Sequence, residues 1–545
     1  MRTVLIAASL LLLLAGVAVA QQASPLLQAM QTELDRSFAA LRFAEETPLY
    51  YLSYRVTDTE RHDISASYGA ISDDNRSHDR NLNIDCRVGD YQLDNTHEIR
   101  GEYSSGGSGP SPNLPLDNDE LAIRTVIWRA TDQAYRDALE SYTKVLTNDQ
   151  VLVEKEDTSA DFSHEQPHQY VGAEVAASFD SEDWKPRLRR ISAIFKEYPF
   201  VETSSLQISL TNDNRYFVDS DGAKIQTGQS YARLFVRCSG TAEDGMQIDR
   251  YESFDAATPA GLPDDATIEA AAKRLIAELE ALLTAPLAEP YTGPAILVNR
   301  AAGVFFHEIF GHRIEGHRQK SEFEGQTFTR KVNEQILPEF MSIYDDPTMP
   351  EFEGQFLRGF YRYDDQGVET ERVPVVENGV LRNFLMSRSP IANFPKSNGH
   401  GRAQAGRDVV SRQGNLLITS TNEYDFETLK EKLLDECRSQ GKPYGLIFYD
   451  ISGGFTMTGR YSPQSFKVIP LLVYRVYTDG REPEVIRGVD IVGTPLTSFA
   501  RITATGNDYG IFNGTCGAES GWVPVSAIAP SVLVSEVEIE KKAKE

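Results

Sequence analysis

The segment 307–312, with the sequence HEIFGH, holds the most reactive set of side chains in this chain. His307 and His312 are imidazoles of the kind that bind zinc, and Glu308 is a carboxylate set between them. In a hydrolytic zinc site the imidazoles hold the ion, and the carboxylate takes a proton from the water that the ion activates. The segment therefore predicts a metal site with a general base.

The spacing of the two imidazoles constrains the backbone that carries them. An α-helix turns by about 100° per residue, so positions five apart point roughly 140° away from each other. His307 and His312 can share one ion only if the helix contains a π-bulge or ends between them, and Gly311 favours an end. The alternative is a helix with two unrelated surface histidines. That alternative is disfavoured because three of the nine histidines, His317 included, fall in this short segment.

Two imidazoles do not complete a catalytic zinc site. Such an ion normally takes three protein ligands and leaves a fourth position for water. Glu315 and His317 are close in sequence and Cys516 is distant. The spacing alone does not choose among these three.

A second pair of histidines has the spacing of a zinc-binding helix but not its flanks. His164 and His168 enclose Glu165 and Pro167. Proline removes a helix hydrogen bond and clashes with the preceding turn, and no apolar stripe flanks the motif. We therefore predict no metal site there.

The elements that must hold these groups differ between the two halves of the chain. Apolar spacing and capping residues predict helices from Pro25, over 118–146, over 265–283 and over 426–437, and one after residue 298 that carries His307. Short strands are expected at 51–56, 206–210, 234–238 and 295–298. The fold class is therefore α+β. The proline-bounded stretch 286–294 is the predicted boundary between an N-terminal mixed α/β domain (21–289) and a mostly β C-terminal domain (290–545) that carries the metal-site helix.

Four ordered segments of the C-terminal half resemble the TldD/PmbA family of metallopeptidases. The segment 301–316, AAGVFFHEIFGHRIEG, looks like the zinc motif of that family. Three further segments agree in the same order: SNGHGR at 397–402, GTPL at 493–496, and GTCG at 514–517 followed by VPV at 523–525. The N-terminal half resembles the family only in its α/β pattern.

The resemblance implies a zinc site of one ion per active subunit. Carried over by position, His307, His312 and Cys516 are the metal ligands and Glu308 is the general base. The chain resembles the metal-bearing kind of subunit, because every element of the motif is present. The implied substrates are extended peptides or unfolded proteins, and the implied assembly is a homodimer or a heterodimer with a related subunit.

Two further segments are candidates for binding a substrate. His400 and Arg402, in the glycine-rich loop 397–407, offer hydrogen-bond donors to a carbonyl or a terminal carboxylate. The alternative is a tight turn whose arginines pair with the chain's own carboxylates. Gly453 and Gly454 let a peptide backbone approach closely, although such a pair is equally often a bend.

The N-terminus and the charge bear on compartment and partners. Arg2, an apolar run over 4–17 and the sequence AVA at 18–20 are typical of a secretory signal peptide cleaved after Ala20, so we expect an exported, periplasmic or secreted protein with no membrane span in the mature chain. The chain carries 54 basic and 80 acidic side chains, a formal net charge of −26. Such a surface repels phosphate backbones, which disfavours nucleic-acid binding.

Four scattered cysteines do not form a disulfide framework. Cys86 and Cys238 fall in strand-like segments and are the pair we expect if a disulfide forms, and Cys437 has no assigned role. Two rival functions remain open. One is a non-catalytic partner with a structural zinc, which Glu315 or His317 in the fourth position would favour. The other is a zinc amidohydrolase with deformylase-like chemistry, which a smaller pocket would favour.

Overall fold

The computed structural model describes residues 23–99, 111–149, 157–461 and 465–541. The expected signal peptide, residues 1–20, lies outside the described residues. Within the described part, no helix combines the length and the apolar character that crossing a bilayer requires.

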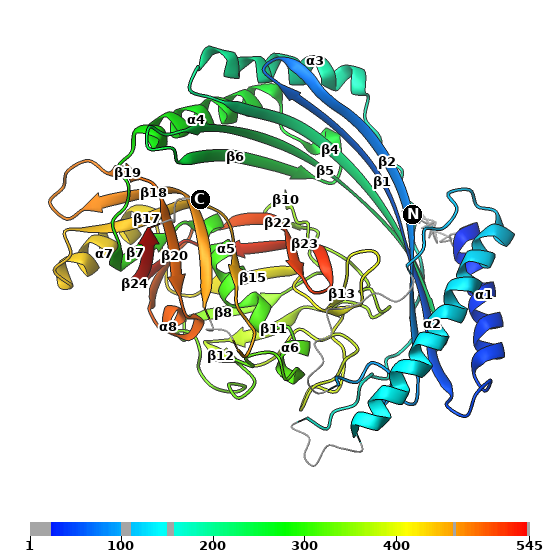
Figure 1. Ribbon diagram of the computed structural model, residues 1–545. Helices are drawn as coiled ribbons and strands as arrows, with labels where there is room; N and C mark the ends of the chain where they lie inside the picture. Colours follow the sequence, from blue (N-terminus) through cyan, green and yellow to red (C-terminus); the bar gives the residue numbers. More distant parts are fainter. Residues whose placement is uncertain (1–22, 100–110, 150–156, 462–464, 542–545) are drawn as a thin grey trace, which may run out of the picture.

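The N-terminal half forms one sheet of long strands that arches over the C-terminal half (Figure 1). The strand order is β2-β1-β4-β5-β3, and β6 also pairs with β5. Neighbouring strands are antiparallel, except that β3 runs parallel to β5. The strands are β1 (Leu49–Ser67), β2 (Ala70–Val88), β3 (Gln169–Val171), β4 (Thr203–Asp219), β5 (Lys224–Thr241) and β6 (Gln247–Ala256).

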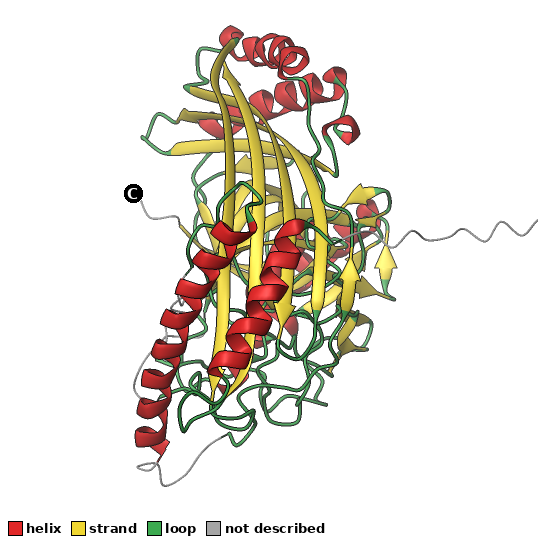
Figure 2. Ribbon diagram, turned by 90° about the vertical axis from the view of Figure 1, so that its right-hand side faces the viewer, coloured by secondary structure: helices red, strands yellow, loops and turns green. Residues whose placement is uncertain are grey.

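Two pairs of helices cover the outer face of this sheet at its two ends (Figure 1), and Figure 2 looks onto one pair in front of the strands. The helices are α1 (Pro25–Leu41), α2 (Glu120–Asp149), α3 (Ser181–Ser192) and α4 (Asp265–Thr284), with short 3₁₀ turns η1 (Ala193–Glu197) and η2 (Pro259–Gly261). Helix α1 begins where the Ser24 hydroxyl accepts from the Leu27 N–H, and Pro25 occupies the first turn. Helix α4 begins in the same way at Asp264, whose carboxylate accepts from the Thr267 N–H.

The C-terminal half contains two main sheets. One has the order β12-β11-β8-β15-β23-β22, so that β22 forms its edge. In the other, β7-β17-β18-β20-β24 closes into a ring because β24 also pairs with β7, and β21, β16 and β19 extend it. The strands are β7 (Tyr291–Leu297), β8 (Met341–Asp345), β9 (Glu351–Phe352), β10 (Gln355–Phe356), β11 (Val373–Glu377), β12 (Val380–Leu381), β13 (Gly401–Arg402), β14 (Val410–Ser411), β15 (Asn415–Ser420), β16 (Glu423–Tyr424), β17 (Tyr444–Thr456), β18 (Phe466–Tyr477), β19 (Glu484–Ile486), β20 (Val489–Gly493), β21 (Ile502–Gly506), β22 (Gly510–Ala518), β23 (Gly521–Ala529) and β24 (Val532–Lys541).

Helix α5 (Asn299–Ile309) is the central helix of the C-terminal half. All its residues from Ala301 to Ile309 are buried, because it packs against strands of both sheets. A helix that is apolar on nearly every side is the kind that a core can enclose. The remaining helices are η3 (Gly311–Arg313), α6 (His317–Lys320), α7 (Phe426–Ser439) and α8 (Pro495–Phe499).

The predicted fold class, α+β with a mostly β C-terminal part, is confirmed. The predicted helices form close to their expected bounds, but the strands of the first half are much longer than expected. Each strand of the first sheet precedes residue 290, and every described strand of the other sheets follows it. The expected pairing of Cys86 with Cys238 is wrong. Both thiols are free and buried, and they lie in separate apolar clusters, one under α1 and α2 and the other under α3 and α4.

Candidate metal centre

The backbone between the two imidazoles leaves the helix. Helix α5 ends at Ile309, Phe310 departs from helical geometry with φ −117° and ψ −52°, and a 3₁₀ turn follows at Gly311–Arg313. Two histidines five positions apart were expected to face one ion through either a π-bulge or the end of the helix. In the structure the helix ends between them. His312 therefore turns back towards His307, and the ring centroids lie 5.2 Å apart.

The Gln413 side chain packs directly against Gly311 at this turn. A Cβ built on Gly311 would lie 1.8 Å from Oε1 of Gln413, so the amide end of that side chain would have to move. Gln413 is itself buried, in the segment that leads into β15. Glycine at 311 therefore lets this buried side chain lie against the backbone at the end of the helix.

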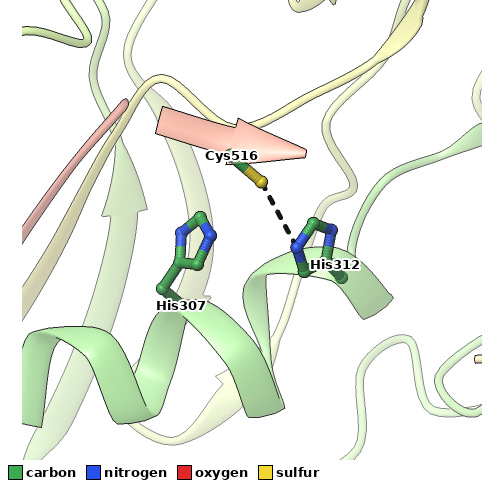
Figure 3. A group of neighbouring side chains, drawn as sticks. All are labelled: His307, His312 and Cys516. Carbon is green, nitrogen blue, oxygen red and sulfur yellow. Dashed lines mark hydrogen bonds between the residues drawn. The ribbon is translucent and has the colours of Figure 1, made fainter. Parts of the chain in front are cut away.

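Cys516 completes the group from the opposite end of the chain. It lies on β22, across from Val523 of β23, and its side chain points at the two imidazoles (Figure 3). The Sγ atom is 3.3 Å from Nε2 of His312, and the candidate ligand atoms of the three residues all lie within 4.8 Å of one another. All three side chains are buried.

The charges of this group favour the ligand form of the cysteine. Burial alone would raise the pKa of the Cys516 thiol, but the positive charges of His312, His307 and Arg412 outweigh burial and hold this pKa well below its usual range. Burial lowers the pKa of each imidazole, but the negative charges of Cys516 together with Glu308 at His307 and Glu315 at His312 outweigh burial and raise it. The thiolate is the form of cysteine that binds metal ions.

Glu315 and His317 are not part of this three-residue group. Glu315 is completely buried, and its Oε2 lies 3.3 Å from Nδ1 of His312. A carboxylate on the outer nitrogen of a histidine orients the ring and leaves the other nitrogen for the metal. His317 instead pairs with Glu519. Sequence reasoning had left both residues open as ligands.

A metal ion fits the residues that are present. Nδ1 of His307 is buried and has no hydrogen-bond partner among the described residues, which is rare for a buried polar atom unless a ligand or an ion satisfies it. Two imidazoles and a thiolate are a donor set that suits zinc and supplies three of its usual four ligands. His307, His312 and Cys516 are therefore the residues that would hold the ion.

Glu308 lies beside this group, buried to 8% exposure. Its carboxylate has no ion-pair or hydrogen-bond partner within the part of the chain that the structure describes. Strand β17 passes directly over it: a Cβ on Gly454 would lie 3.0 Å from Cγ of Glu308 and 2.6 Å from the Lys467 carbonyl oxygen. A Cβ on Gly453 would meet nothing within 4 Å. Glycine at 454 thus leaves room for the carboxylate beside the predicted ligands.

The two candidate substrate contacts of the loop 397–407 differ in surroundings. His400 is completely buried, with Nδ1 3.0 Å from two oxygens of Asn398 and Nε2 3.2 Å from Oδ1 of Asp345. This arrangement favours the alternative of a turn held by its own polar groups. Arg402 is 3% exposed, donates to the Gln413 carbonyl oxygen and stacks over Tyr361, but it also lines a large cavity.

Sequence reasoning missed Arg412. This side chain is completely buried, its Nε lies 3.3 Å from Oε1 of Glu315, and it donates to the Cys516 carbonyl oxygen at 2.8 Å. It therefore joins the two remote parts of the site. Nothing in the sequence around Arg412 distinguishes it from the chain's many exposed arginines. Residues 164–168, which hold the second pair of histidines, form no helix.

Comparisons with known proteins agree with this geometry. Residues 290–541 match the family model described as the PmbA/TldA metallopeptidase C-terminal domain. The chain is 32% identical over 264 residues to a metalloprotease of Archaeoglobus fulgidus, covering 47% of this chain and 56% of the relative. It is 28% identical to a zinc metalloprotease TldD homolog of Saccharolobus solfataricus, covering 49% and 55%. The match thus spans little more than half the length of these relatives.

Solved structures share the fold over nearly the whole chain. TldE from Thermococcus kodakarensis superposes with a TM-score of 0.61 at 14% identity, covering 94% of this chain and 99% of its own. A protein of Thermotoga maritima described as a putative modulator of a DNA gyrase gives 0.60 at 17% identity, covering 94% and 100%. At such identities the likeness concerns fold alone. Residues 290–541 therefore carry the C-terminal domain of the PmbA/TldA metallopeptidase family, and the chain as a whole shares the fold of these solved structures.

Proposed function

We propose that this chain is a zinc-dependent metallopeptidase that hydrolyses peptide bonds in unstructured peptides or unfolded proteins. One observation carries the proposal: two imidazoles and a thiolate present ligand atoms within 4.8 Å of one another, beside a buried carboxylate with no other partner among the described residues. That combination is what metal-assisted hydrolysis needs.

Each residue has a separate task in this proposal. His307, His312 and Cys516 hold the ion, and Glu315 keeps the His312 ring in the orientation that turns Nε2 towards the ion. A bound zinc ion supplies Lewis-acid chemistry, which polarises a carbonyl and makes a neighbouring water more acidic. Glu308 takes the proton of the attacking water and can return it to the leaving amine.

The alternative of a structural zinc has less support. It requires a fourth protein ligand, and the two nearest candidates, Glu315 and His317, are engaged with other side chains. Within the described residues, no further histidine, cysteine or carboxylate joins the three-residue group. An open fourth position favours a catalytic site over a structural one.

The test compares the wild-type protein with Glu308→Gln. We expect equal zinc content and a loss of cleavage of a random-coil peptide mixture of about 10²–10⁴-fold, the usual worth of a general base. Glu334→Gln is the matched control, because Glu334 is exposed and pairs with Lys331 on the surface. Removing zinc with a chelator should also stop cleavage, and adding zinc back should restore it. Equal activity in Glu308→Gln and wild type would disprove the mechanism.

We also propose that the protein is exported after cleavage following Ala20 and that it works as a dimer, either with itself or with a related subunit. The signal-like N-terminus supports the first statement, and the family resemblance supports the second. N-terminal sequencing of the mature protein should begin at Gln21, and light scattering should give twice the mass of one chain. A mature protein that begins at Met1, or a monomer in solution, would contradict these statements.

A further inference from the structure

A cavity of about 600 Å³ lies between the inner face of the N-terminal sheet and the C-terminal half. We call it the interdomain cavity. Along β4, Gln207, Ser209 and Thr211 line it, whereas Leu206 and Ile208 point the opposite way into the apolar cluster under α3 and α4. Alternate residues of a strand face opposite sides, so one face of this sheet is core and the other is a polar wall.

The opposite wall of the cavity includes the strand that carries the thiolate. Thr515 lines the cavity, and Cys516, the next residue of β22, faces the imidazoles. The cavity therefore lies behind this strand, and none of the three predicted metal ligands lines it. Any role of the cavity is separate from holding the ion.

The charge of the cavity walls is opposite to that of the whole protein. Five arginines and three aspartates line the cavity, in a chain with a formal net charge of −26. Three of the arginines have carboxylate partners: Arg61 with Asp63, Arg215 with Asp365, and Arg233 with Asp255. The other two, Arg358 and Arg402, have no carboxylate within ion-pair distance among the described residues.

Arg358 and Arg402 are also the most deeply buried of the five. Arg358 is 8% exposed, and its Nε has no hydrogen-bond partner among the described residues. Its Nη1 lies 3.3 Å from Oγ1 of Thr515, and its guanidinium stacks over Tyr231. Arg402 is 3% exposed. Both also line a smaller adjoining pocket, so the two guanidiniums face the same space.

Two buried cations without an ion-pair partner are costly to the folded protein. Burial and the positive charges of neighbouring arginines, Arg233 for Arg358 and Arg215 for Arg402, lower the pKa of both guanidiniums. The more distant carboxylates of Asp255 and Asp365 raise these pKa values by less. A buried charge is normally compensated by a partner of opposite sign. Asp255 and Asp365 act on these two guanidiniums from beyond ion-pair distance and offset their charge only in part, which leaves a direct carboxylate partner to be supplied by a ligand.

We propose that Arg358 and Arg402 form a carboxylate-binding site in the interdomain cavity. The planar guanidinium donates two parallel N–H groups to the two oxygens of a carboxylate. Three aspartates in the same walls disfavour a dianion such as phosphate. That the carboxylate belongs to a peptide, as its C-terminus or as an acidic side chain, rests on the proposed function.

The experiment measures binding without cleavage. In the Glu308→Gln background, calorimetry gives Kd values for three N-acetylated pentapeptides: penta-alanine with a free C-terminus, its C-terminal amide, and the amide with one central glutamate. We expect at least one acidic peptide to bind about tenfold or more tightly than the neutral amide. Tighter binding of the peptide with the free C-terminus would identify a terminal carboxylate as the ligand, and tighter binding of the glutamate peptide would identify an acidic side chain. Equal affinities, or no binding of any peptide, would overturn the proposal.

Matched variants assign the effect to these arginines. Arg358→Met and Arg402→Met should each abolish the preference for an acidic peptide, whereas Arg61→Met, in the same cavity but on the opposite wall and paired with Asp63, should keep it. Removing an uncompensated buried charge should leave the melting temperature of Arg358→Met unchanged or higher. If both variants keep the preference for an acidic peptide and have a lower melting temperature, then Arg358 and Arg402 are structural residues. If wild type proves inactive on all peptides, the binding result still stands by itself.

Discussion

Replacing Glu315 by glutamine tests whether the metal centre depends on the side chain behind His312. The Glu315 carboxylate is completely buried and lies 3.3 Å from Nδ1 of His312, 2.8 Å from Nε of Arg318 and 3.3 Å from Nε of Arg412. His312 and Arg318 hydrogen-bond to one of its oxygens, Oε2, and Arg412 forms an ion pair with the other, Oε1. An amide of the same size carries no charge and offers one oxygen, so at least one donor loses its acceptor.

The magnitude follows from what the carboxylate does at each contact. Removing a side chain that hydrogen-bonds to a metal-bound histidine typically weakens metal binding 10–100-fold, which is about 1.4–2.7 kcal/mol. The loss of a buried charge partner typically costs about 3–5 kcal/mol of folding stability. Arg318 keeps Glu324 and Glu519 as partners, so we expect the lower end of that range. Arg412 has no second carboxylate within ion-pair distance among the described residues, so it loses its ion pair.

The assay is a zinc competition titration against a chelator at fixed pH, combined with urea unfolding of the zinc-free protein. Glu324→Gln is the control, because Glu324 also pairs with Arg318, at 2.6 Å, but does not contact His312. We expect weaker zinc binding in Glu315→Gln and near wild-type binding in Glu324→Gln. If Glu315→Gln binds zinc as tightly as wild type, then the carboxylate does not orient the histidine and the reasoning is wrong.

Two further predictions concern glycine and a buried acid. Gly454→Ala should keep zinc but lose about 10²-fold in peptide cleavage, because the new Cβ would lie 2.6 Å from the Lys467 carbonyl oxygen and 3.0 Å from Cγ of Glu308, so that strand β17 and the carboxylate must shift. Gly453→Ala should retain activity, because its Cβ would meet nothing within 4 Å; cleavage and metal content of both variants decide this. Burial raises the pKa of Asp364 to about 7, against the backbone N–H groups that lower it. The folded protein thus keeps a proton that the unfolded chain releases near pH 4. The free energy of unfolding should therefore fall by up to about 4 kcal/mol as the pH rises from 4 to 7 and level off above pH 7. The midpoint of urea unfolding of Asp364→Asn should lack this decrease between pH 4 and pH 7.

These two predictions fail in distinct ways. Equal activity of the two alanine variants would show that the space over Glu308 does not matter. A difference in stability between wild type and Asp364→Asn that stays constant from pH 4 to pH 8 would show that Asp364 does not change its protonation in this range.

The helices were the most predictable part of the fold. Ser24 and Asp264 supply side-chain caps, and apolar residues follow at helical spacing, so local sequence was sufficient. The long strands were less predictable. The expected strand 51–56 is the start of β1, which continues to Ser67 through the polar stretch 57–63. That stretch lacks apolar alternation because Thr57, Thr59 and Arg61 line the interdomain cavity, and Asp58, on the other face, pairs with Arg80 rather than joining an apolar core.

The metal centre was predictable only as far as local spacing and resemblance reach. The distance between His307 and His312 indicated that the helix must bulge or end, and Gly311 favoured an end. The reason for that glycine, the side chain of Gln413, comes from a different segment of the chain. The roles of Glu315 and Arg412 also depend on contacts between remote segments, which no local pattern encodes.

The metal centre joins parts of the chain that are far apart: His312 and Cys516 are separated by 204 positions. During synthesis the two imidazoles emerge long before the thiolate, so an incomplete chain offers an ion two ligands at most. Tight metal capture must therefore wait until β22 has been made and has docked against α5. A bound ion would cross-link these two parts and so close a very long loop of the chain. Closing that loop costs conformational entropy during folding, and the free energy of metal binding would offset this cost. A chain that ends before residue 516 would lack the thiolate and therefore the cross-link that the metal ion makes.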